Sequence, residues 1–517
     1  MKKIYFVFLA MLCMGAYTLQ AQSWYSSLPV VSVAPDPGGI PPSTGNGALR
    51  DAVSATGASA IYELERGGVY FVNATCAFGA TDAVVRAKAG TGPRPVVVPY
   101  TVSGTSNDVF SGTGNLRLEN LYVYALEPGG VTRRAVLRMS VGTGNDYEFE
   151  NCFFDGGSSA SVLRFENLNG DGTNPPSLTV NNCILRNSVD YANVGNARGV
   201  DLRDSKNFNA TITNCTFYSI SAQTLRLGTN HDAADVIVFE NNTIYGAAAA
   251  FDLGTTGQAS VKNNIFYNMV LNGSTADAAG IITFTSSDYP REGITIANNL
   301  FYRDPEFDAL VPQTPPRYLT TNVFDTQGYS LVDNGEVVVS DTLSYAIDFK
   351  NPPASVFPFY QYLWANDIPG TAIPAEDQTF IRREVTPPPF VGDVLGSVAP
   401  YDFSYPKSSP AATAGEGGTY LGAWAPNSGE AISPINANNV INCWFDVNAK
   451  TLNMTLGSSV PIVKVSIYTL TGALVANQLV TTNGKTAEFM PAGLSNGVYL
   501  YVVEIPDGVM TRGKFVY

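Results

Sequence analysis

Histidine is almost missing from this 517-residue sequence, which contains only His231. Metal centres built from several histidine ligands are therefore excluded, and a Ser-His-Asp triad would have to use this one residue. No nucleophile stands in a recognisable motif around it. We interpret His231 as an ordinary loop residue.

Basic residues are also scarce, with 30 Lys and Arg against 44 Asp and Glu and a net charge of −14. A nucleic-acid partner is not expected, because binding to phosphates needs a basic surface. Beyond the N-terminus, no stretch approaches the roughly 20 apolar residues that a membrane-spanning helix requires.

The single long apolar stretch opens the chain. Lys2 and Lys3 form a basic start, an apolar segment follows from Ile4 to Leu19, and Ala21 is a small residue at the expected cleavage position. This pattern predicts a signal peptide over residues 1–21. We therefore expect an exported protein, at the cell surface or outside the cell.

A repeat runs through the middle of the sequence. Each copy centres on an Asn followed by short segments of β-branched and aromatic residues, and the copies lie 22 to 35 residues apart. The aligned residues are Asn120, Asn151, Asn182, Asn214, Asn241, Asn263 and Asn298. Such a period with variable insertions indicates a solenoid.

The flanking segments alternate like strands and carry no helical stripe, so the sequence predicts an all-β fold, a parallel β-helix with one coil per repeat. Asn tolerates the left-handed backbone of a tight bend, and stacked Asn amides can hydrogen-bond along the column. The seven residues are predicted to form a structural Asn ladder.

A second column lies 11 to 18 residues before each of the last six Asn residues. Each coil has an apolar–X–apolar segment, and alternation places X on the outside of the coil. The outward residues are Arg138, Arg164, Asp201, Arg226, Asp252 and Thr283, with Arg203, Asp204 and Lys206 close to the third of them.

Two interpretations of this charged column stay open. As a substrate-binding face, it offers Arg forks for carboxylates and sugar hydroxyls. Asp201 and Asp252, two coils or about 9.6 Å apart, lie near the upper limit for an inverting pair of carboxylates. Alternatively, Asp201, Arg226 and Asp252 form only a surface charge ladder, worth at most about 1 kcal/mol per exposed pair.

With these columns, residues 45–425 resemble the right-handed β-helix family that includes pectate lyases. Residues 47–53 read as a short helix that caps the open end, and residues 408–424 resemble the segment that closes such domains. The predicted domain spans residues 22–424, with irregular final coils and a covering loop over residues 303–400. The resemblance implies binding or cleavage of a polysaccharide, by a lyase or a glycoside hydrolase if the protein is an enzyme. No complete catalytic motif is visible, so a non-catalytic surface adhesin or structural protein is the alternative.

After a Pro/Gly/Ser/Asn linker over residues 425–440, the pattern changes to alternating strands. The segments at residues 463–468, 493–503 and 512–516 resemble, in order, the motifs of the type IX secretion C-terminal sorting domain, a small β-sandwich. The resemblance implies that residues 441–517 engage the type IX secretion machinery. The usual Pro-Asn-Pro is missing near the domain start, and an accessory carbohydrate-binding sandwich is the alternative.

Two further patterns concern cysteine and calcium. Cys152, Cys183 and Cys215 share one column, which favours a buried stack of small side chains over a disulfide, because three in a column leave one unpaired. Asn167, Asn169 and Asp171 resemble the start of a calcium loop, but Leu178 stands where the bidentate acid belongs. We expect no cofactor and no metal site, with calcium at these three residues as the one open possibility.

Overall fold

A computed structural model gives the structure of the chain. It describes residues 24–426 and 441–517, except for residues 40, 43–44, 101–107, 128–131, 141–143, 168–169, 171–173, 191–194, 203–204, 228–234, 273–278, 286–290, 292, 312–318, 354–400, 447–448, 457–461, 470–473, 484–485, 492, 496 and 505–509. The chain divides into two compact units, one ending at Pro426 and the other beginning at Asn427. Within the described residues, no helix has the length and apolar character needed to cross a membrane.

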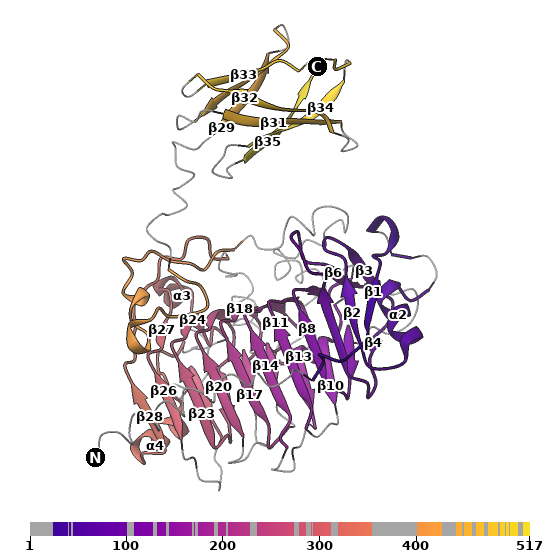
Figure 1. Cartoon of the computed structure of the whole chain (residues 1–517). Coiled ribbons are helices and arrows are strands. Elements are labelled where there is room, and N and C mark those ends of the chain that lie inside the picture. Colours follow the sequence, from indigo (N-terminus) through magenta and orange to yellow (C-terminus); the bar gives the residue numbers. More distant parts are fainter. Residues whose placement is uncertain are drawn as a thin grey trace, which may run out of the picture. The chain divides into compact units, whose positions relative to one another are not determined.

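The first unit is a stack of coils whose strands form three parallel sheets (Figure 1). Sheet A contains β1 (Val30–Val33), β2 (Ala60–Leu64), β5 (Ala83–Ala87), β8 (Leu116–Glu119), β11 (Asp146–Glu150), β14 (Ser177–Asn181), β17 (Asn209–Thr213), β20 (Val236–Glu240), β23 (Gln258–Lys262), β26 (Ile294–Ala297) and β28 (Val337–Ser340). Sheet B contains β3 (Val69–Val72), β6 (Val96–Pro99), β9 (Tyr122–Tyr124), β12 (Phe153–Asp155), β15 (Ile184–Ser188), β18 (Thr216–Ile220), β21 (Thr243–Ala247), β24 (Ile265–Met269) and β27 (Leu300–Tyr302). Sheet C contains β4 (Cys76–Ala77), β7 (Phe110–Gly112), β10 (Ala135–Ser140), β13 (Ser161–Glu166), β16 (Val200–Asp201), β19 (Leu225–Arg226), β22 (Phe251–Gly254) and β25 (Ile282–Phe284).

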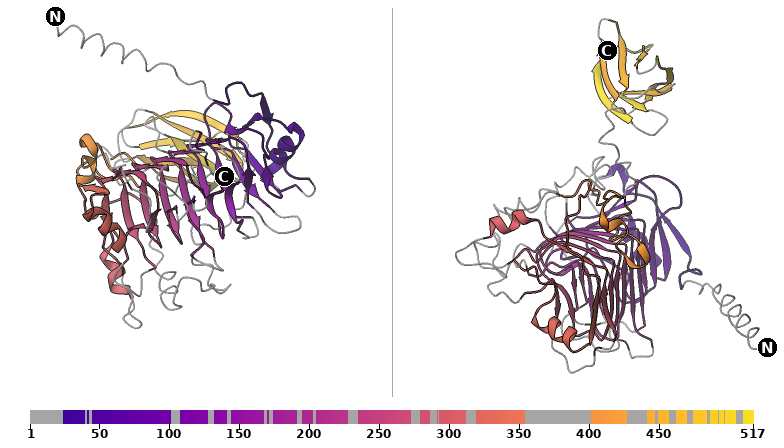
Figure 2. Two further views of the ribbon diagram at one scale, coloured as in Figure 1. Left: turned by 90° about the horizontal axis from the view of Figure 1, so that it is seen from below. Right: turned by 90° about the vertical axis from the view of Figure 1, so that its left-hand side faces the viewer.

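From β4 onward, each complete coil contributes one strand to sheet C, then one to sheet A, then one to sheet B, and equivalent strands pair in parallel (Figure 2). Inward side chains from all three sheets build one continuous apolar core along the stack. The predicted all-β fold, a parallel β-helix, is confirmed.

Helix α2 (Ala48–Thr56) packs its buried Leu49 and Val53 against the first coils, where the sequence predicted a capping helix. Buried Asp36 fixes its start, since Oδ1 accepts the Ala48 N–H at 3.0 Å and Oδ2 accepts the Phe71 N–H at 2.6 Å. Burial raises the pKa of Asp36 above its ordinary value. At the other end, α3 (Pro305–Leu310) and α4 (Thr326–Asp333) follow the last coils, and α4 packs against β25 and β28.

The corner between sheets A and B has a constant form. In all seven coils of the predicted Asn column, two residues separate the two strands, and the first is the Asn. All seven have left-handed φ angles between 51° and 58°. Each Asn N–H donates to the backbone oxygen just before the next equivalent position, as from Asn151 to Asn181 O at 3.0 Å.

The side-chain contacts of this outer column are less regular. Asn151 and Asn182 donate to the Asn one coil before them, whereas Asn214 donates to Asn181 instead, at 2.8 Å. Asn263 accepts the Glu416 N–H at 2.8 Å. The Asn residues of the outer column therefore form the corner through their backbone conformation. The side chains of Asn263 and Asn298 also hydrogen-bond to residues 414–416, which lie against the stack.

The second residue of the corner points inward and forms a buried column of Cys152, Cys183, Cys215, Asn242, Asn264 and Asn299. Asn264 Nδ2 donates to Asn299 Oδ1 at 2.9 Å and to Phe239 O at 2.8 Å, while its Oδ1 accepts the Asn242 N–H at 2.8 Å. The three cysteines continue the column as free thiols. The continuous buried amide ladder thus lies one residue after the Asn column chosen from the sequence.

Residues 343–349 and 401–424 cover part of the outer face of sheet B. Phe403 packs on Tyr218 and Tyr245, and the Trp424 indole donates to Thr216 Oγ1 at 2.7 Å. The short 3-10 turns at Pro410–Ala412 and Glu416–Gly418 belong to this segment. It runs along the side of the stack, and most of the predicted covering loop lies outside the described residues.

Buried charges lie on the same face. Arg186 contacts the Asp155 carboxylate at 2.6 Å and donates to the Tyr218 hydroxyl at 2.7 Å, and all three residues are at most 2% exposed. Burial alone lowers the pKa of Arg186, but the charge of Asp155 and the neighbouring tyrosines outweigh it and raise that pKa well above its ordinary value.

The second unit has two antiparallel sheets that share one apolar core. The first comprises β29 (Ile441–Asp446), β30 (Thr451–Leu456) and β33 (Thr486–Phe489); the second comprises β31 (Ile462–Thr469), β32 (Leu474–Thr481), β34 (Val498–Glu504) and β35 (Met510–Val516). Leu452 and Phe489 from the first sheet join Val465 and Val503 from the second in that core. The arrangement agrees with the predicted small sandwich.

Candidate functional site

The two corners beside sheet C vary in length even among the seven coils in which the corner between sheets A and B is constant. Between sheets B and C, the connection ranges from three residues (248–250) to twelve (270–281). Between sheets C and A, it ranges from three residues (255–257) to ten (167–176). Insertions thus fall on both sides of sheet C, and binding residues tend to lie on such variable connections over a rigid scaffold.

The charged column predicted from the sequence occupies successive strands of sheet C. Arg138 pairs in register with Arg164, Arg164 with Asp201, Asp201 with Arg226, Arg226 with Asp252, and Asp252 with Thr283. A register shift between Asp252 and Gly254 marks the end of the regular column. The backbone therefore presents these residues as one row, although their side chains differ in what they contact.

Glu166 neutralises the first two members of the row. Arg138 Nε donates to Glu166 Oε2 at 2.7 Å, and Arg164 forms an ion pair with Oε1 of the same carboxylate. Glu166 follows in β13 two residues after Arg164 and is buried. Sequence analysis missed it because it lies outside the apolar–X–apolar segment, although an acid two residues along the same strand shares a face with Arg164.

Asp201 departs from the prediction of an outward, exposed residue. It is 0% exposed, and its Oδ2 lies 3.7 Å from Arg198 Nη1. Arg198 is also buried, and donates to Gln223 Oε1 at 2.9 Å and to the Asn196 oxygen at 2.6 Å. The interpretation of Asp201, Arg226 and Asp252 as an exposed ladder of ion pairs is therefore wrong in this part of the row.

Arg226 has a different environment. It is half-buried, its Nη1 is inaccessible to solvent, and that atom has no hydrogen-bond partner within the described structure. No ion pair joins it to Asp201 or Asp252 among the described contacts; Asp252 Oδ1 instead accepts the Gly254 N–H at 2.8 Å. A guanidinium normally uses several donors, and no described ion pair neutralises this one, so the solvent-accessible part of Arg226 can bind an oxygen-rich ligand.

The remaining predicted site residues lie on the connections between the strands. Arg203, Asp204, His231, Asn169 and Asp171 lie outside the described residues. Lys206 and Asn167 are exposed, and Asn167 has a left-handed φ of 54°. Across the described part of the chain, no group of three or more His, Cys, Asp or Glu side chains is arranged to hold a metal ion.

Residues 198–347 match the protein family described as "Right handed beta helix region". Together with the stacked parallel sheets, this match settles the architecture. The fold is a right-handed parallel β-helix.

One solved structure shows a weak likeness to the chain. The crystal structure of the alginate lyase from Paenibacillus sp. str. FPU-7 aligns with 50% of this chain and 84% of its own at 12% sequence identity, with a TM-score of 0.37. That likeness is too weak to support any argument about this β-helix. No curated protein sequence matches the chain.

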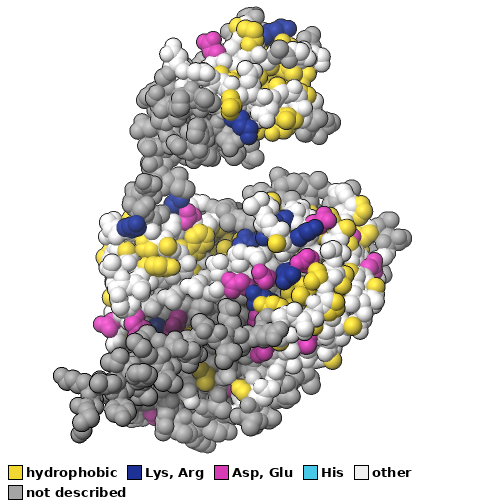
Figure 3. All heavy atoms as spheres, in the orientation of Figure 1, with side chains coloured by type: hydrophobic (Ala, Val, Ile, Leu, Met, Phe, Trp, Pro, Cys, Tyr) yellow, Lys and Arg dark blue, Asp and Glu magenta, His cyan; other side chains and the backbone are white. Residues whose placement is uncertain are grey.

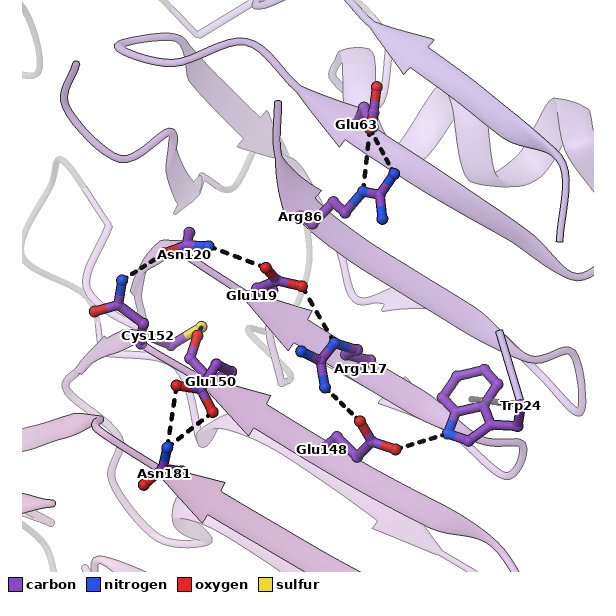
Figure 4. A network of polar contacts seen from close by, with 11 residues as sticks. Trp24, Glu63, Arg86, Arg117, Glu119, Asn120, Glu148, Glu150, Cys152 and Asn181 are labelled. Carbon is purple, nitrogen blue, oxygen red and sulfur yellow. Dashed lines mark hydrogen bonds and ion pairs between the residues drawn. The ribbon is translucent and has the colours of Figure 1, made fainter. Parts of the chain in front are cut away.

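A second polar surface lies on the outer face of sheet A and was not foreseen. Arg117 of β8 bridges Glu119 of the same strand, at 3.2 Å, and Glu148 of β11 (Figure 4). Glu148 Oε1 also accepts the Trp24 indole N–H at 3.0 Å. The acids and Arg117 stand at alternating strand positions in the sequence, but Trp24 and Glu148 are 124 positions apart, so no sequence pattern indicates their contact.

Proposed function

We propose that the protein binds an acidic polysaccharide along sheet C, with Arg226 as the contact for a sugar carboxylate. The supporting observation is that Arg226 is half-buried, so part of its side chain reaches solvent, and that no ion pair neutralises it among the described contacts. A carboxylate supplies two oxygens that match the planar guanidinium fork. Variable connections on both sides of the sheet are well placed to define a groove for an extended polymer.

The partners of the neighbouring charges argue for binding more than for hydrolysis. An inverting hydrolase needs two available carboxylates about 6.5–9.5 Å apart. Asp201 is enclosed beside Arg198, and Asp252 accepts a backbone N–H from its own strand. Glu166 already neutralises Arg138 and Arg164. Arg226 is therefore the member of the row most available to a ligand.

The test uses the mature chain and polygalacturonate, a polymer with one carboxylate per sugar. We expect Arg226→Ala to weaken binding at least about tenfold, or roughly 1.4 kcal/mol, with little change in melting temperature because no described interaction is lost. Arg86→Ala is the matched control, since Arg86 lies on sheet A and pairs with Glu63 at 2.7 Å. Binding should also weaken as salt is raised.

Equal affinities for Arg226→Ala and the unaltered chain would refute this site, as would the absence of binding to polygalacturonate and to alginate. Assaying the same mixtures for unsaturated and reducing-end products separates binding from cleavage. Absence of binding to any polysaccharide would instead favour the surface adhesin or structural protein.

We also propose that the protein is exported, and that residues 441–517 act as a type IX sorting domain. The supporting observations are the three sequence motifs and the compact antiparallel unit that contains them. Deletion of residues 441–517 should leave a folded β-helix in the periplasm, measured by surface proteolysis and fractionation. Arrival of the truncated chain at the surface would contradict the proposal.

A further inference from the structure

Two aromatic residues lie on the outer face of sheet A, far from the row on sheet C. Trp24 and Tyr25 pack edge to face, with ring centroids 5.2 Å apart and an interplanar angle of 86°. Trp24 donates its indole N–H to Glu148, and the Arg117 guanidinium lies 5.1 Å from the centre of the Tyr25 ring. These contacts hold the segment before β1 across β8 and β11.

Both rings remain half-buried rather than covered. The charged side chains below them are also partly accessible, with 29% of Glu119, 27% of Glu148 and 16% of Arg117 exposed. In the space-filling view, acidic and basic side chains lie beside hydrophobic ones on the β-helical unit (Figure 3). Because Trp24 contacts Glu148 and Arg117 lies over Tyr25, the rings and the charged groups belong to one surface.

We propose that Trp24, Tyr25, Arg117, Glu119 and Glu148 form a second binding site, which takes a neutral sugar unit of a polysaccharide. A sugar ring has one face rich in C–H groups, which packs on an aromatic ring, and a rim of hydroxyls. Trp and Tyr suit such ligands because they supply large, rigid, amphipathic surfaces. Carboxylate oxygens keep additional acceptor sites after one hydrogen bond is made, so Glu119 and Glu148 can accept sugar hydroxyls.

The charge of this surface selects against an acidic sugar. Glu119, Glu148 and the neighbouring Glu150 outnumber Arg117, which both Glu119 and Glu148 already contact. Arg86, in register with Glu119 on the next strand, is paired with Glu63. Another carboxylate would add like charge at short range, which costs free energy even in a partly solvated site. The two faces of the β-helix therefore differ in ligand class: sheet C suits an acidic sugar, and sheet A a neutral one. This second site does not depend on the proposal for sheet C.

The experiment measures binding of neutral cello- and manno-oligosaccharides to the full mature chain by calorimetry and by tryptophan fluorescence. We expect Trp24→Ala to lower affinity at least about tenfold and Glu119→Gln to lower it less. Trp24→Phe keeps an aromatic ring but removes the N–H, so it should retain most of the affinity and lose the fluorescence response. Tyr329→Ala is the matched aromatic control, because the Tyr329 side chain on α4 is exposed, and it should bind as the unaltered chain does.

Arg226→Ala should leave neutral-sugar binding unchanged, which separates failure at sheet A from failure at sheet C. If Trp24→Ala lowers the melting temperature strongly, the affinities of the folded Trp24→Phe and Glu119→Gln variants are compared with that of the unaltered chain instead. No binding of neutral oligosaccharides by the folded chain would overturn the proposal. Unchanged affinity in both Trp24→Ala and Glu119→Gln would do the same, as would preference of this surface for a cationic peptide such as oligolysine.

Discussion

Replacing Asn264 by Ala should destabilise the β-helix more than a substitution of this size usually does. Asn264 is 0% exposed, and its amide makes the three short contacts with Asn299, Phe239 and Asn242 described above. Without the side chain, the buried Asn242 N–H loses its acceptor at 2.8 Å, and the Phe239 oxygen loses a donor. Asn242 and Phe239 are both 0% exposed.

The magnitude follows from these contacts. A typical hydrogen bond contributes about 1 kcal/mol net, and a buried group left unsatisfied costs about 1–3 kcal/mol more. Two such groups together predict a loss of roughly 4 kcal/mol. Cys183→Ala tests the same column with a weaker partner, because Cys183 Sγ accepts the Cys152 N–H at 3.3 Å and thiol sulfur is a poor acceptor. We expect a loss nearer about 1–2 kcal/mol there.

Urea unfolding followed by far-UV circular dichroism measures both variants, using the shift of the midpoint together with the slope. A changed slope would indicate that the stack no longer unfolds as one unit. The view that the inward amide ladder stabilises the stack would be refuted if Asn264→Ala lowered the free energy of unfolding by less than about 1 kcal/mol. It would also be refuted if Asn264→Ala lowered it by no more than Cys183→Ala does.

Two further predictions concern buried groups. Arg186→Met should lower the free energy of urea unfolding by about 3–5 kcal/mol, because it leaves the Asp155 charge buried without its cation. Adding Asp155→Asn should restore part of this stability. If the double variant is no more stable than Arg186→Met, the buried ion pair is not the cause of the loss. In a Cys443→Ala background, the native chain should not react with a thiol reagent between pH 7 and 9. Burial raises the pKa of Cys76 to about 12 and those of Cys152 and Cys183 well above their ordinary value, so these thiols stay protonated there. Cys215 is 0% exposed, so the reagent cannot reach it in the folded chain. Fast reaction of the folded protein, rather than only of the urea-unfolded one, would contradict this.

The fold was accessible from the sequence because one corner has the same form in seven successive coils. In each of them a left-handed Asn, such as Asn151 or Asn241, stands between two short strands, so the repeat survives insertions elsewhere. The row on sheet C was predictable for the same reason, since register follows from alternation. The ion-pair partners of the row could not be predicted from the sequence, because they depend on how deeply each side chain is buried and on which neighbouring side chain reaches it. Glu166 and Arg198 lie outside the apolar–X–apolar pattern, and nothing in the segment around Asp201 indicates that this residue is buried.

The constant two-residue corner also separates two kinds of change during divergence. The connections between sheets B and C and between C and A range from three residues to twelve while the stack continues. A changed length at one of these seven Asn corners would instead move the inward second residue of that coil out of the buried amide column. Segments beside sheet C can therefore be lengthened or shortened at little risk to folding, whereas the same change at the opposite corner disturbs the core.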